Sequence, residues 1–583
     1  MKKSLLLLMS AVVLSLFLAS CGRNNEPEGT TDTNETTDSR TTPPPTNEDG
    51  NELEPITVTW FNTLHMITPF QETMVGEEIF RRTGIRLEII SGDMDLFMVL
   101  AAGGDLPDVV WLANDDGTIA RTLMDTGAVI PLDDLLAERG QNVLRRNSEG
   151  MRLLREQHGS EQTFFIPTAT SELNLDNPAM NPWTGIYTRH DLWVAMGAPE
   201  VNGEDEFLQM LRRMQDENPI SPVGTRTFAI SAWTDWGLWP YLFMYPQMYG
   251  YRGSQPFFFN IEDYSFQISF TDPDSIFWRG IEFYFKANQL GIFDPEGLVQ
   301  NWAQYAAKVN NGEVFVGPAS DWEPPDTSIN PPEAGRLFHI PGAFPHIHGV
   351  WAADNPGGWG FSNARGISAN AQHPERIMDL FNFLDSDEGA RLLHSGVEGV
   401  HWDWIDGEPQ PIGDWLAAQM GDAELWTRVV EEQGVSRLQF NNSGTWVADD
   451  GFPIAVGGVA IAREVAKNNP AMAAFAEFHG LPGAFPGEVY ADWVHRGIAR
   501  SPYHFYNIPD HMPPGPPEFG QIISLAEQFI IANLGDLILA ADPAAFEAQK
   551  ARVIDEINRM GFPEVVEDMH RSWAIAYDIV FGN

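Results

Sequence analysis

The chain of 583 residues carries 81 acidic and 35 basic side chains, which gives a formal charge of -46 at pH 7. A surface this acidic repels phosphate backbones, so the composition excludes nucleic-acid binding as the function. Hydrophobic residues make up 43% of the chain, and no apolar run after residue 21 is expected to reach membrane-spanning length, so the body is expected to be a globule in water.

The first segment has the features of a secretory signal. Lys2 and Lys3 precede an apolar stretch over residues 5–19, which is short for a membrane span. Residues 18–22 read Leu-Ala-Ser-Cys-Gly and resemble a bacterial lipobox, in which the cysteine receives a diacylglycerol and becomes the first residue of the mature chain. Cys21 is the only cysteine in the sequence, so the chain can form no intramolecular disulfide, and we expect a lipid anchor there. The alternative is a signal peptide that ends in a cysteine by chance.

A polar segment follows and extends to residue 54. It is rich in Thr, Asn, Glu and Asp and includes three consecutive prolines at 43–45. Such a composition cannot bury a core, so the segment is predicted to be a disordered tether between the anchor and the globule.

The globule begins with alternating strand and helix patterns. Residues 56–60 alternate apolar and polar side chains as a strand does, and Thr68, Pro69 and Gln71 predict the capped start of a helix that ends at Gly84. A second strand is expected from Ile85, a second helix over 95–102 and a third strand over 108–112. This repetition favours a parallel sheet with right-handed crossovers.

Longer runs of the sequence resemble a known family. Residues 101–110 and 127–136 are similar to the amino-terminal lobe of bacterial extracellular solute-binding proteins, the substrate receptors of ATP-driven importers. The likeness continues through segments 166–167, 185–193, 305–322, 358–370 and 386–389. Two further stretches, 396–404 and 541–577, are similar to the large LipO-like solute-binding lipoproteins of Gram-positive bacteria.

The resemblance implies an α/β fold. The expected architecture is two-lobed and periplasmic-binding-protein-like (type II), with mainly parallel sheets flanked by helices and a hinge between the lobes. The expected order is a signal peptide (1–20), the lipidated cysteine and tether (21–54), the N-terminal lobe (55–167), the C-terminal lobe (168–355), a return crossover with the rest of the N-terminal lobe (356–400), and the remaining lobe segments with C-terminal helices (401–583).

The resemblance also implies a function. The protein is expected to bind a carbohydrate, in particular an oligosaccharide, between its lobes and to deliver it to a membrane permease that works with a separate ATPase. A monomer is expected, anchored at the outer face of the cell membrane, without a cofactor or a metal. Some relatives carry a calcium loop after the helix that corresponds to residues 204–214. Residues 217–224 lack the string of oxygen ligands that calcium needs, so no calcium is expected there.

Two other classes of function stay open. A secreted carbohydrate-active hydrolase would need two carboxylates that flank the scissile bond, and the pairs Asp115-Asp116 and Asp449-Asp450 are candidates. The usual motifs of serine, zinc and phosphate-binding sites are absent from the sequence, and adjacent acids arise by chance in so acidic a chain. The second class is a ligand-sensing surface lipoprotein without a role in transport.

Two pairs of residues are candidate metal ligands. His346 with His348, and His401 with Asp403, have spacings that can place two ligands on one side of a strand, but each set lacks a third and a fourth ligand. Ordinary loop histidines are the simpler interpretation. Residues 385–388 are predicted to cap a helix rather than to hold calcium.

The candidate binding residues are selected by position. A sugar site needs aromatic faces and hydrogen-bonding groups, and in open α/β sheets it lies beyond the carboxyl ends of the strands. In the first lobe the candidates are Trp60, Asn62, His65, Trp111, Asn114 and Asp115. In the later segments they are Trp183, Arg189, Trp233, Trp236, Asp321, Trp322, Trp359, His401 and Trp402. For Trp60 and Trp111 a place in the core is an equal alternative, and the cluster around Trp233 also has the alternative of a packed core.

Overall fold

The computed structural model describes residues 53–62, 70–112, 117–168, 170–172, 185–318 except Gln255, 337–347, 355–358, 360–361, 363–436 except Gly421, and 446–582 except Tyr503. All of them belong to the second of two compact units, Pro45–Asn583. The predicted signal segment, Cys21 and nearly all of the tether lie outside the described residues, so they stay predictions.

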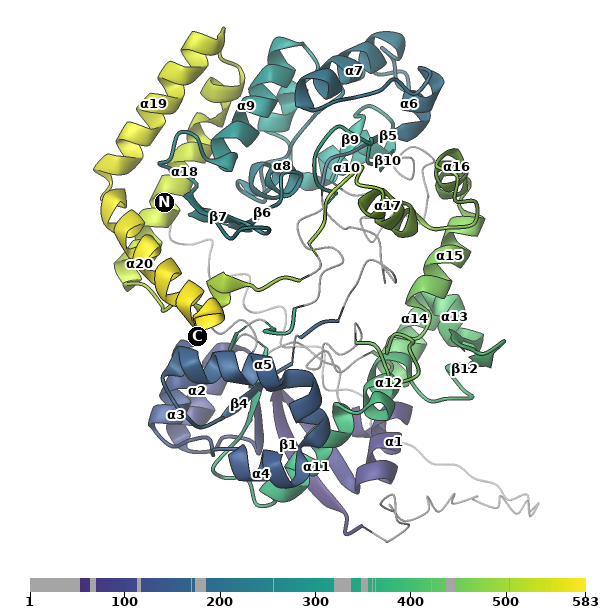
Figure 1. The fold of residues 1–583 in the computed structure, drawn as a ribbon, viewed down its shortest axis with the longest axis vertical. Coiled ribbons are helices and arrows are strands. Elements are labelled where there is room, and N and C mark those ends of the chain that lie inside the picture. The colour runs from purple at the N-terminus through teal and green to yellow at the C-terminus, as the bar shows by residue number, and fades with distance from the viewer. Residues whose placement is uncertain are drawn as a thin grey trace, which may run out of the picture. The chain divides into compact units, whose positions relative to one another are not determined.

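A five-stranded mixed sheet organises the first region of the globule (Figure 1). Its strand order is β2-β1-β3-β11-β4. β1 pairs in parallel with β2 along its whole length and with β3, whereas β11 runs antiparallel to β3 and β4. The strands are β1 (Ile56–Asn62), β2 (Ile85–Ser91), β3 (Val109–Leu112), β4 (Phe165–Pro167) and β11 (Ala364–Ile367). The three strands predicted from the N-terminal pattern are thereby confirmed, and they are the parallel part of the sheet.

The connection between β1 and β2 is the predicted helix, with a different start. A single turn, η1 (Phe70–Glu72), precedes α1 (Met74–Thr83), and the N-cap is Thr73, whose hydroxyl accepts a hydrogen bond from the backbone N–H of Gly76 at 3.0 Å. The predicted N-cap Thr68 and first helical residue Pro69 lie outside the described residues, and among the described ones the α-helix begins later than expected, after Thr73. Gly84 ends the helix as expected, with a φ of 69° that favours glycine.

Helices pack around this sheet and close the first core. Trp60 and Trp111 lie in it, and so does the buried pair Arg365–Asp385, with 2.6 Å between Nη2 and Oδ2. The helices are α2 (Met94–Gly103), α3 (Thr118–Asp125), α4 (Asp133–Arg139), α5 (Gln141–His158), α11 (Pro374–Leu384), α12 (Asp387–Ser395), α13 (Gly413–Gln419) and α14 (Ala423–Trp426). Residues before 167 and after 360 thus share hydrophobic clusters, and the lobe boundaries expected from the sequence stay predictions.

The second sheet is antiparallel. Its order is β10-β5-β9, built from β5 (Tyr187–Arg189), β9 (Val316–Gly317) and β10 (Leu337–Phe338). Both partners of β5 run against it, so the expectation of a mainly parallel sheet was wrong here. The reason is that neither partner is joined to β5 by a single crossover helix. Among the described residues of this region, the bridges Phe228–Val314 and Ile230–Phe293 are parallel.

Helices and two small antiparallel sheets complete the described fold. The second core joins residues 186–347 to the C-terminal helices, with Leu153 of α5 among its members. The sheets are β6-β7-β8, from Tyr251–Ser254, Phe257–Asn260 and Phe266–Ile268, and the hairpin β12-β13, from Trp402–Ile405 and Glu408–Pro411. The helices are α6 (His190–Ala195), α7 (Glu204–Glu217), α8 (Tyr245–Gln247), α9 (Ile276–Gln289), α10 (Trp302–Asn310), α15 (Gly458–Asn468), α16 (Pro470–Phe478), α17 (Pro486–His495), α18 (Pro517–Ile538), α19 (Pro543–Arg559) and α20 (Phe562–Phe581). Shorter helical turns are η2 (Pro240–Met244), η3 (Pro295–Leu298), η5 (Thr427–Glu432) and η7 (Ile508–His511).

Chain segments that run between the two cores are tied to one another. The N–H of Thr168 donates to the carbonyl of Asn363 at 3.0 Å, and Ser171 pairs with Asn355 in an antiparallel bridge. The indole of Trp446 donates to the carbonyl of Thr170 at 3.1 Å. Arg146 of α5 lies over the Trp446 ring at 5.0 Å and makes ion pairs with Glu172 at 2.6 Å and Asp387 at 2.7 Å. The crossover segments therefore form one hydrogen-bonded bundle.

One helix departs from the expectation about apolar runs. Among the described residues, α18 is long and apolar enough to cross a membrane by length and composition, and 33% of its most apolar window is buried. The statement that no such run follows residue 21 was therefore wrong. Ala526, Ile530 and Leu537 of α18 belong to the second core, which gives the apolar composition a packing role.

Candidate functional site

A cluster of aromatic rings stands at the start of α10. We call it the tryptophan cluster and define it as Trp233, Trp236, Trp239, Trp302 and Tyr305. The rings of Trp236 and Trp302 stack with centroids 5.0 Å apart and an interplanar angle of 24°. Trp233 meets the edge of Trp302 at 4.8 Å and that of Trp236 at 5.8 Å. The cluster includes two predicted candidates, Trp233 and Trp236, which the structure brings into contact.

Hydrogen bonds hold the loop that carries these rings. The N–H of Trp302 donates to Oδ1 of Asp235 at 2.8 Å, and the amide of Gln300 donates to Ser231 Oγ at 2.8 Å and to the carbonyl of Ala232 at 2.6 Å. Asn301 caps α10 and forms a capping box with Gln304. The loop after residue 230 is thus fixed to the helix start, and the rings are positioned before any ligand arrives.

Burial divides the cluster into a base and a face. Trp233 and Tyr305 are fully buried, and the hydroxyl of Tyr305 donates to the carbonyl of Val316 at 3.0 Å. Trp302 and Trp239 are half-buried, whereas Trp236 is 37% exposed. Exposed polar side chains flank this face, from Asp235, Asn301 and Gln304. An aromatic face with a polar rim can cover the C–H face of a pyranose and bond its hydroxyls.

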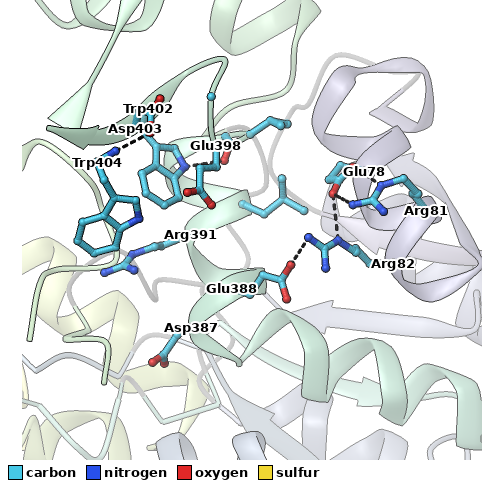
Figure 2. A pocket seen from close by; sticks show the side chains of 14 residues that line it. Glu78, Arg81, Arg82, Asp387, Glu388, Arg391, Glu398, Trp402, Asp403 and Trp404 are labelled. Atoms are coloured by element: carbon cyan, nitrogen blue, oxygen red, sulfur yellow. Dashed lines mark hydrogen bonds and ion pairs between the residues drawn. The ribbon is translucent and has the colours of Figure 1, made fainter. Parts of the chain in front are cut away.

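A pocket lies between α1, α12 and the hairpin β12-β13. We call it the hairpin pocket; its volume is about 770 Å³ (Figure 2). Trp402, another predicted candidate, lines it and donates its indole N–H to the carbonyl of Gly396 at 3.0 Å. The lining residues are Glu78, Arg81, Arg82, Asp387, Glu388, Arg391, Leu392, Gly396, Val397, Glu398, Gly399, Trp402, Asp403 and Trp404.

Ion pairs shape the walls of the hairpin pocket. Arg81 and Arg82 both bind Glu78, and Arg82 also pairs with Glu388 of α12. Burial opposes ionisation of Glu78, but the hydrogen bonds from both arginines outweigh it and hold the pKa of Glu78 below its usual range. In Figure 2 these groups form the wall opposite Trp402 and Trp404.

Three candidates of the first region are buried side chains. Trp60 is 0% exposed and meets Phe381 edge-on at 5.6 Å, and Asn62 is 1% exposed at the end of β1. Trp111 is 1% exposed, and its indole donates to Thr168 Oγ1 at 3.3 Å. For both tryptophans this burial favours the core alternative, because no ring face is open to a ligand in this conformation.

Arg189 and His401 have structural partners. Arg189 forms two hydrogen bonds with Asp191, from Nε at 2.8 Å and from Nη2 at 2.7 Å. His401 accepts the N–H of Val397 at Nδ1, at 2.9 Å, and its Nε2 lies 3.0 Å from Oε1 of Gln433. Both ring nitrogens of His401 are engaged, which supports an ordinary loop histidine behind Trp402. The remaining candidates, His65, Asn114, Asp115, Trp183, Asp321, Trp322 and Trp359, lie outside the described residues.

The acidic groups weighed for other chemistry are in structural pairs. Asp450 binds Arg391, and this contact lowers the pKa of Asp450, whereas a general acid needs a raised pKa. Asp385 pairs with Arg365, and Ser386 is the N-cap of α12, so the predicted helix start is confirmed with a different capping residue. Among the residues that the structure describes, no group of three or more His, Cys, Asp or Glu could hold a metal ion.

Sequence reasoning missed some of these residues. Trp302 contributes to the tryptophan cluster, and the capping pattern of Asn301 and Gln304 around it was an available signal. Trp404 and Arg391 line the hairpin pocket. Trp404 lies in the segment 396–404 that carries the family resemblance, but nothing in the sequence placed it beside α1.

The fold and the aromatic site together define a class of protein, an α/β binding protein with linked crossover segments. The chain belongs to the bacterial extracellular solute-binding protein family, whose sequence profile it matches over residues 68–391. As a member it is an extracellular solute-binding protein rather than an enzyme.

Solved structures are similar to this fold. One is an HMO-binding, ABC-transporter-associated solute-binding protein from Bifidobacterium longum infantis ATCC 15697, with a TM-score of 0.57, 14% identity, and coverage of 91% of this chain and 100% of that chain. Another is an extracellular solute-binding protein from Bifidobacterium longum subsp. infantis, with a TM-score of 0.57, 13% identity, and coverage of 91% and 99%. No curated protein sequence matches the chain significantly.

Proposed function

We propose that the protein captures an oligosaccharide and hands it to the permease of its ABC transporter. The tryptophan cluster carries this proposal, because it offers an exposed indole face on a fixed base with polar groups around it. Family membership gives the binding role, and the similar HMO-binding protein supports the choice of a carbohydrate.

The position of the cluster supports a ligand site. Residues 228–230 pair in parallel with segments at Val314 and Phe293, and the cluster begins directly after them. In α/β sheets, ligands bind beyond the carboxyl ends of parallel strands. The candidates in the loops outside the described residues follow the same rule and belong to the same proposed site between the lobes.

Capture and delivery require two states of the protein. A ligand that touches both lobes favours a closed form over an open one by its difference in affinity for the two. In the proposal, the closed form docks on a membrane permease with a separate ATPase, and a lipid on Cys21 keeps the receptor at the outer face of the membrane. The proposal keeps the lobe boundaries expected from the sequence and takes the crossover bundle as the hinge.

The experiment is a thermal-shift screen of the full-length protein. The probes are short and long neutral oligosaccharides (glucans, galactans, mannans and fructans), uronate oligosaccharides, peptides and metal ions. Specific binding raises the unfolding midpoint by mass action. Mass analysis then shows whether the bound compound is recovered intact.

A rise with one glycan class, recovered intact, is the expected result. Recovery of a cleaved glycan would contradict the receptor function and support the alternative of a carbohydrate-active hydrolase. A response to peptides alone would contradict the choice of carbohydrate while leaving the solute-binding role in place. Transport is tested separately, by uptake of the bound glycan into cells that do and do not carry the gene.

A further inference from the structure

The geometry points to the hairpin pocket as a second binding site for a neutral saccharide chain, separate from the tryptophan cluster. The inference rests on the proposed function in one respect, that the protein's ligand is a carbohydrate. The two sites share no residue, and they belong to different cores.

Part of the hairpin pocket lies at the amino end of the parallel strands of the first sheet, whereas ligands of such folds bind beyond the carboxyl ends. Arg81 and Arg82 are in the last turn of α1, just before Gly84, and β2 begins there with Ile85 paired to Ile56. This is the amino end of the parallel strands. Their carboxyl ends, at Asn62 and Ser91, are roughly 20 Å further along the strands. A ligand held against α1 in this pocket is therefore outside the expected position of the main site.

The pocket has an aromatic wall that a sugar ring can use. Trp404 is 41% exposed, and Arg391 lies near both indoles, 5.7 Å from the Trp402 ring and 5.8 Å from the Trp404 ring. Figure 2 shows Trp404 and Arg391 on one side of the cavity, with Glu398 between them and Arg82. The exposed indole supplies an apolar face, and the guanidinium beside it supplies donors for hydroxyl groups.

The aromatic wall is rigid. Trp402 is 5% exposed, and its indole is bonded to Gly396, whose φ of 78° makes the turn. His401 fixes the same loop through Val397 and Gln433. On the other side, Asp450 orients Arg391 through two hydrogen bonds. Little side-chain ordering is left for the ligand to bring about, which favours binding.

The mixture of charges selects a neutral, polyhydroxylated occupant. Three arginines and five carboxylates line the cavity. The carboxylates would repel a phosphate or a uronate at close range, and the guanidinium groups would repel a cationic peptide. A neutral saccharide uses both sets, since its hydroxyls donate to Glu398 and Asp403 and accept from Arg82 and Arg391. The volume of about 770 Å³ is within the range of small-molecule sites.

Two substitutions test this site without touching the tryptophan cluster. Trp404→Ala removes the exposed indole, and Glu398→Gln keeps the shape of an exposed side chain while it removes the charge. Trp426→Ala is the matched control, because Trp426 is 46% exposed on α14 and lies outside the pocket. Thermal unfolding of each variant verifies that it is folded.

The assay is affinity electrophoresis of the full-length protein through gels that contain one of four neutral polysaccharides (soluble amylose, galactomannan, xylan or levan), with polyuronate and heparin gels for comparison. Calorimetric titration with short oligosaccharides of the same types runs in parallel. We expect Trp404→Ala to weaken retention by a polysaccharide about tenfold, and Glu398→Gln to weaken it several-fold. Neither variant changes the affinity for a short oligosaccharide bound at the cluster, and Trp426→Ala changes neither readout.

The outcomes separate the two proposals. Unchanged retention of both folded pocket variants would overturn the second site and leave the proposed function standing. Loss of short-oligosaccharide binding by Trp404→Ala would also overturn it, because the pocket would then be part of a single site. Retention by polyuronate or heparin but by none of the four neutral polysaccharides would contradict the choice of a neutral chain. If the unsubstituted protein bound no glycan in either assay, both proposals would fall together.

Discussion

The tryptophan cluster and the hairpin pocket present similar side chains on different supports. In the cluster, packed rings hold Trp236, and the N–H of Trp302 donates to the carboxylate of Asp235 on the same loop. In the pocket, ion pairs among Glu78, Arg82 and Glu388 form the wall that faces Trp404. Packing is sensitive to changes in side-chain shape, whereas ion pairs are sensitive to salt and pH. We therefore expect substitutions of packed residues to disrupt the cluster, and salt or acid to weaken the wall of the pocket.

The largest expected effect is at the base of the cluster. Trp233→Ala removes a fully buried indole that contacts Trp236, Trp239 and Trp302. The cavity left behind costs about 3–5 kcal/mol of folding free energy, and the platform above it loses its support. Urea unfolding measures this cost. A cost as small as that of Trp426→Ala, within about 1 kcal/mol, would mean that the base does not hold the platform.

The next effect separates binding from stability. Trp236→Ala removes the exposed face and leaves the buried rings in place, so we expect about 1 kcal/mol of lost stability and roughly tenfold weaker oligosaccharide binding. Calorimetric titration with a glycan identified in the screen checks the affinity. An unchanged dissociation constant would mean that the ligand binds elsewhere, and the tryptophan cluster would then not be a binding site.

Acid should affect the second core before it affects the ion-paired wall of the pocket. The Nε2 atoms of His190 and His479 lie 3.2 Å apart. Burial lowers the pKa of His479 to about 4 and that of His190 to about 3. The unfolded chain binds these protons near the ordinary value of 6.5, so it holds more protons than the folded chain between that pH and about 4. Stability therefore falls as pH drops through this window. In the pocket, the arginines lower the pKa of Glu78, so its contribution is lost only as pH falls below its ordinary value of 4.5.

A matched pair of variants tests the histidine part of this pH dependence. His479→Gln should flatten the fall of the unfolding midpoint between about pH 6.5 and pH 4, because one proton-linked group is gone. His495→Gln changes an exposed histidine and is the control. Parallel curves for all three proteins would show that the buried pair does not govern acid stability.

The smallest effect is expected in the wall of the pocket. Glu388→Gln breaks the contact with Arg82, in which the two side chains are 54% and 41% exposed. Such a pair contributes about 1 kcal/mol or less, and molar salt should remove most of the difference from the unsubstituted protein. Unfolding midpoints at low and high salt measure it. A large cost that salt leaves unchanged would mean that the wall is held by packing, as the cluster is.

The first part of the fold was predictable from local sequence patterns. The strands from Ile56 and Ile85 and the helix end at Gly84 were predictable because alternation and a left-handed cap are encoded by neighbouring residues. The antiparallel second sheet was not, since β5 pairs with strands that are more than a hundred residues away in sequence. No local pattern states which distant strand will be the neighbour, or in which direction it will run.

The same limit applied to the sites. Trp60 and Trp236 both follow or end strand-like segments, and only their distant partners distinguish a core ring from an exposed one. Phe381 covers Trp60, whereas Trp302 supports Trp236 from one side and leaves its face accessible. The hairpin pocket joins α1 to residues of α12 and β12, a juxtaposition that no sequence spacing could reveal.

The bundle of crossover segments has a mechanical consequence. A single strand between two bodies permits bending and twisting alike, but segments bonded side by side behave as a strap. Because Thr168, Ser171 and Trp446 are tied across neighbouring segments, twisting would shear those hydrogen bonds, whereas bending across the strap preserves them. Under the proposed function, the bonded segments would restrict opening and closing to one path, and the shape offered to a permease would then be reproducible from one ligand to the next.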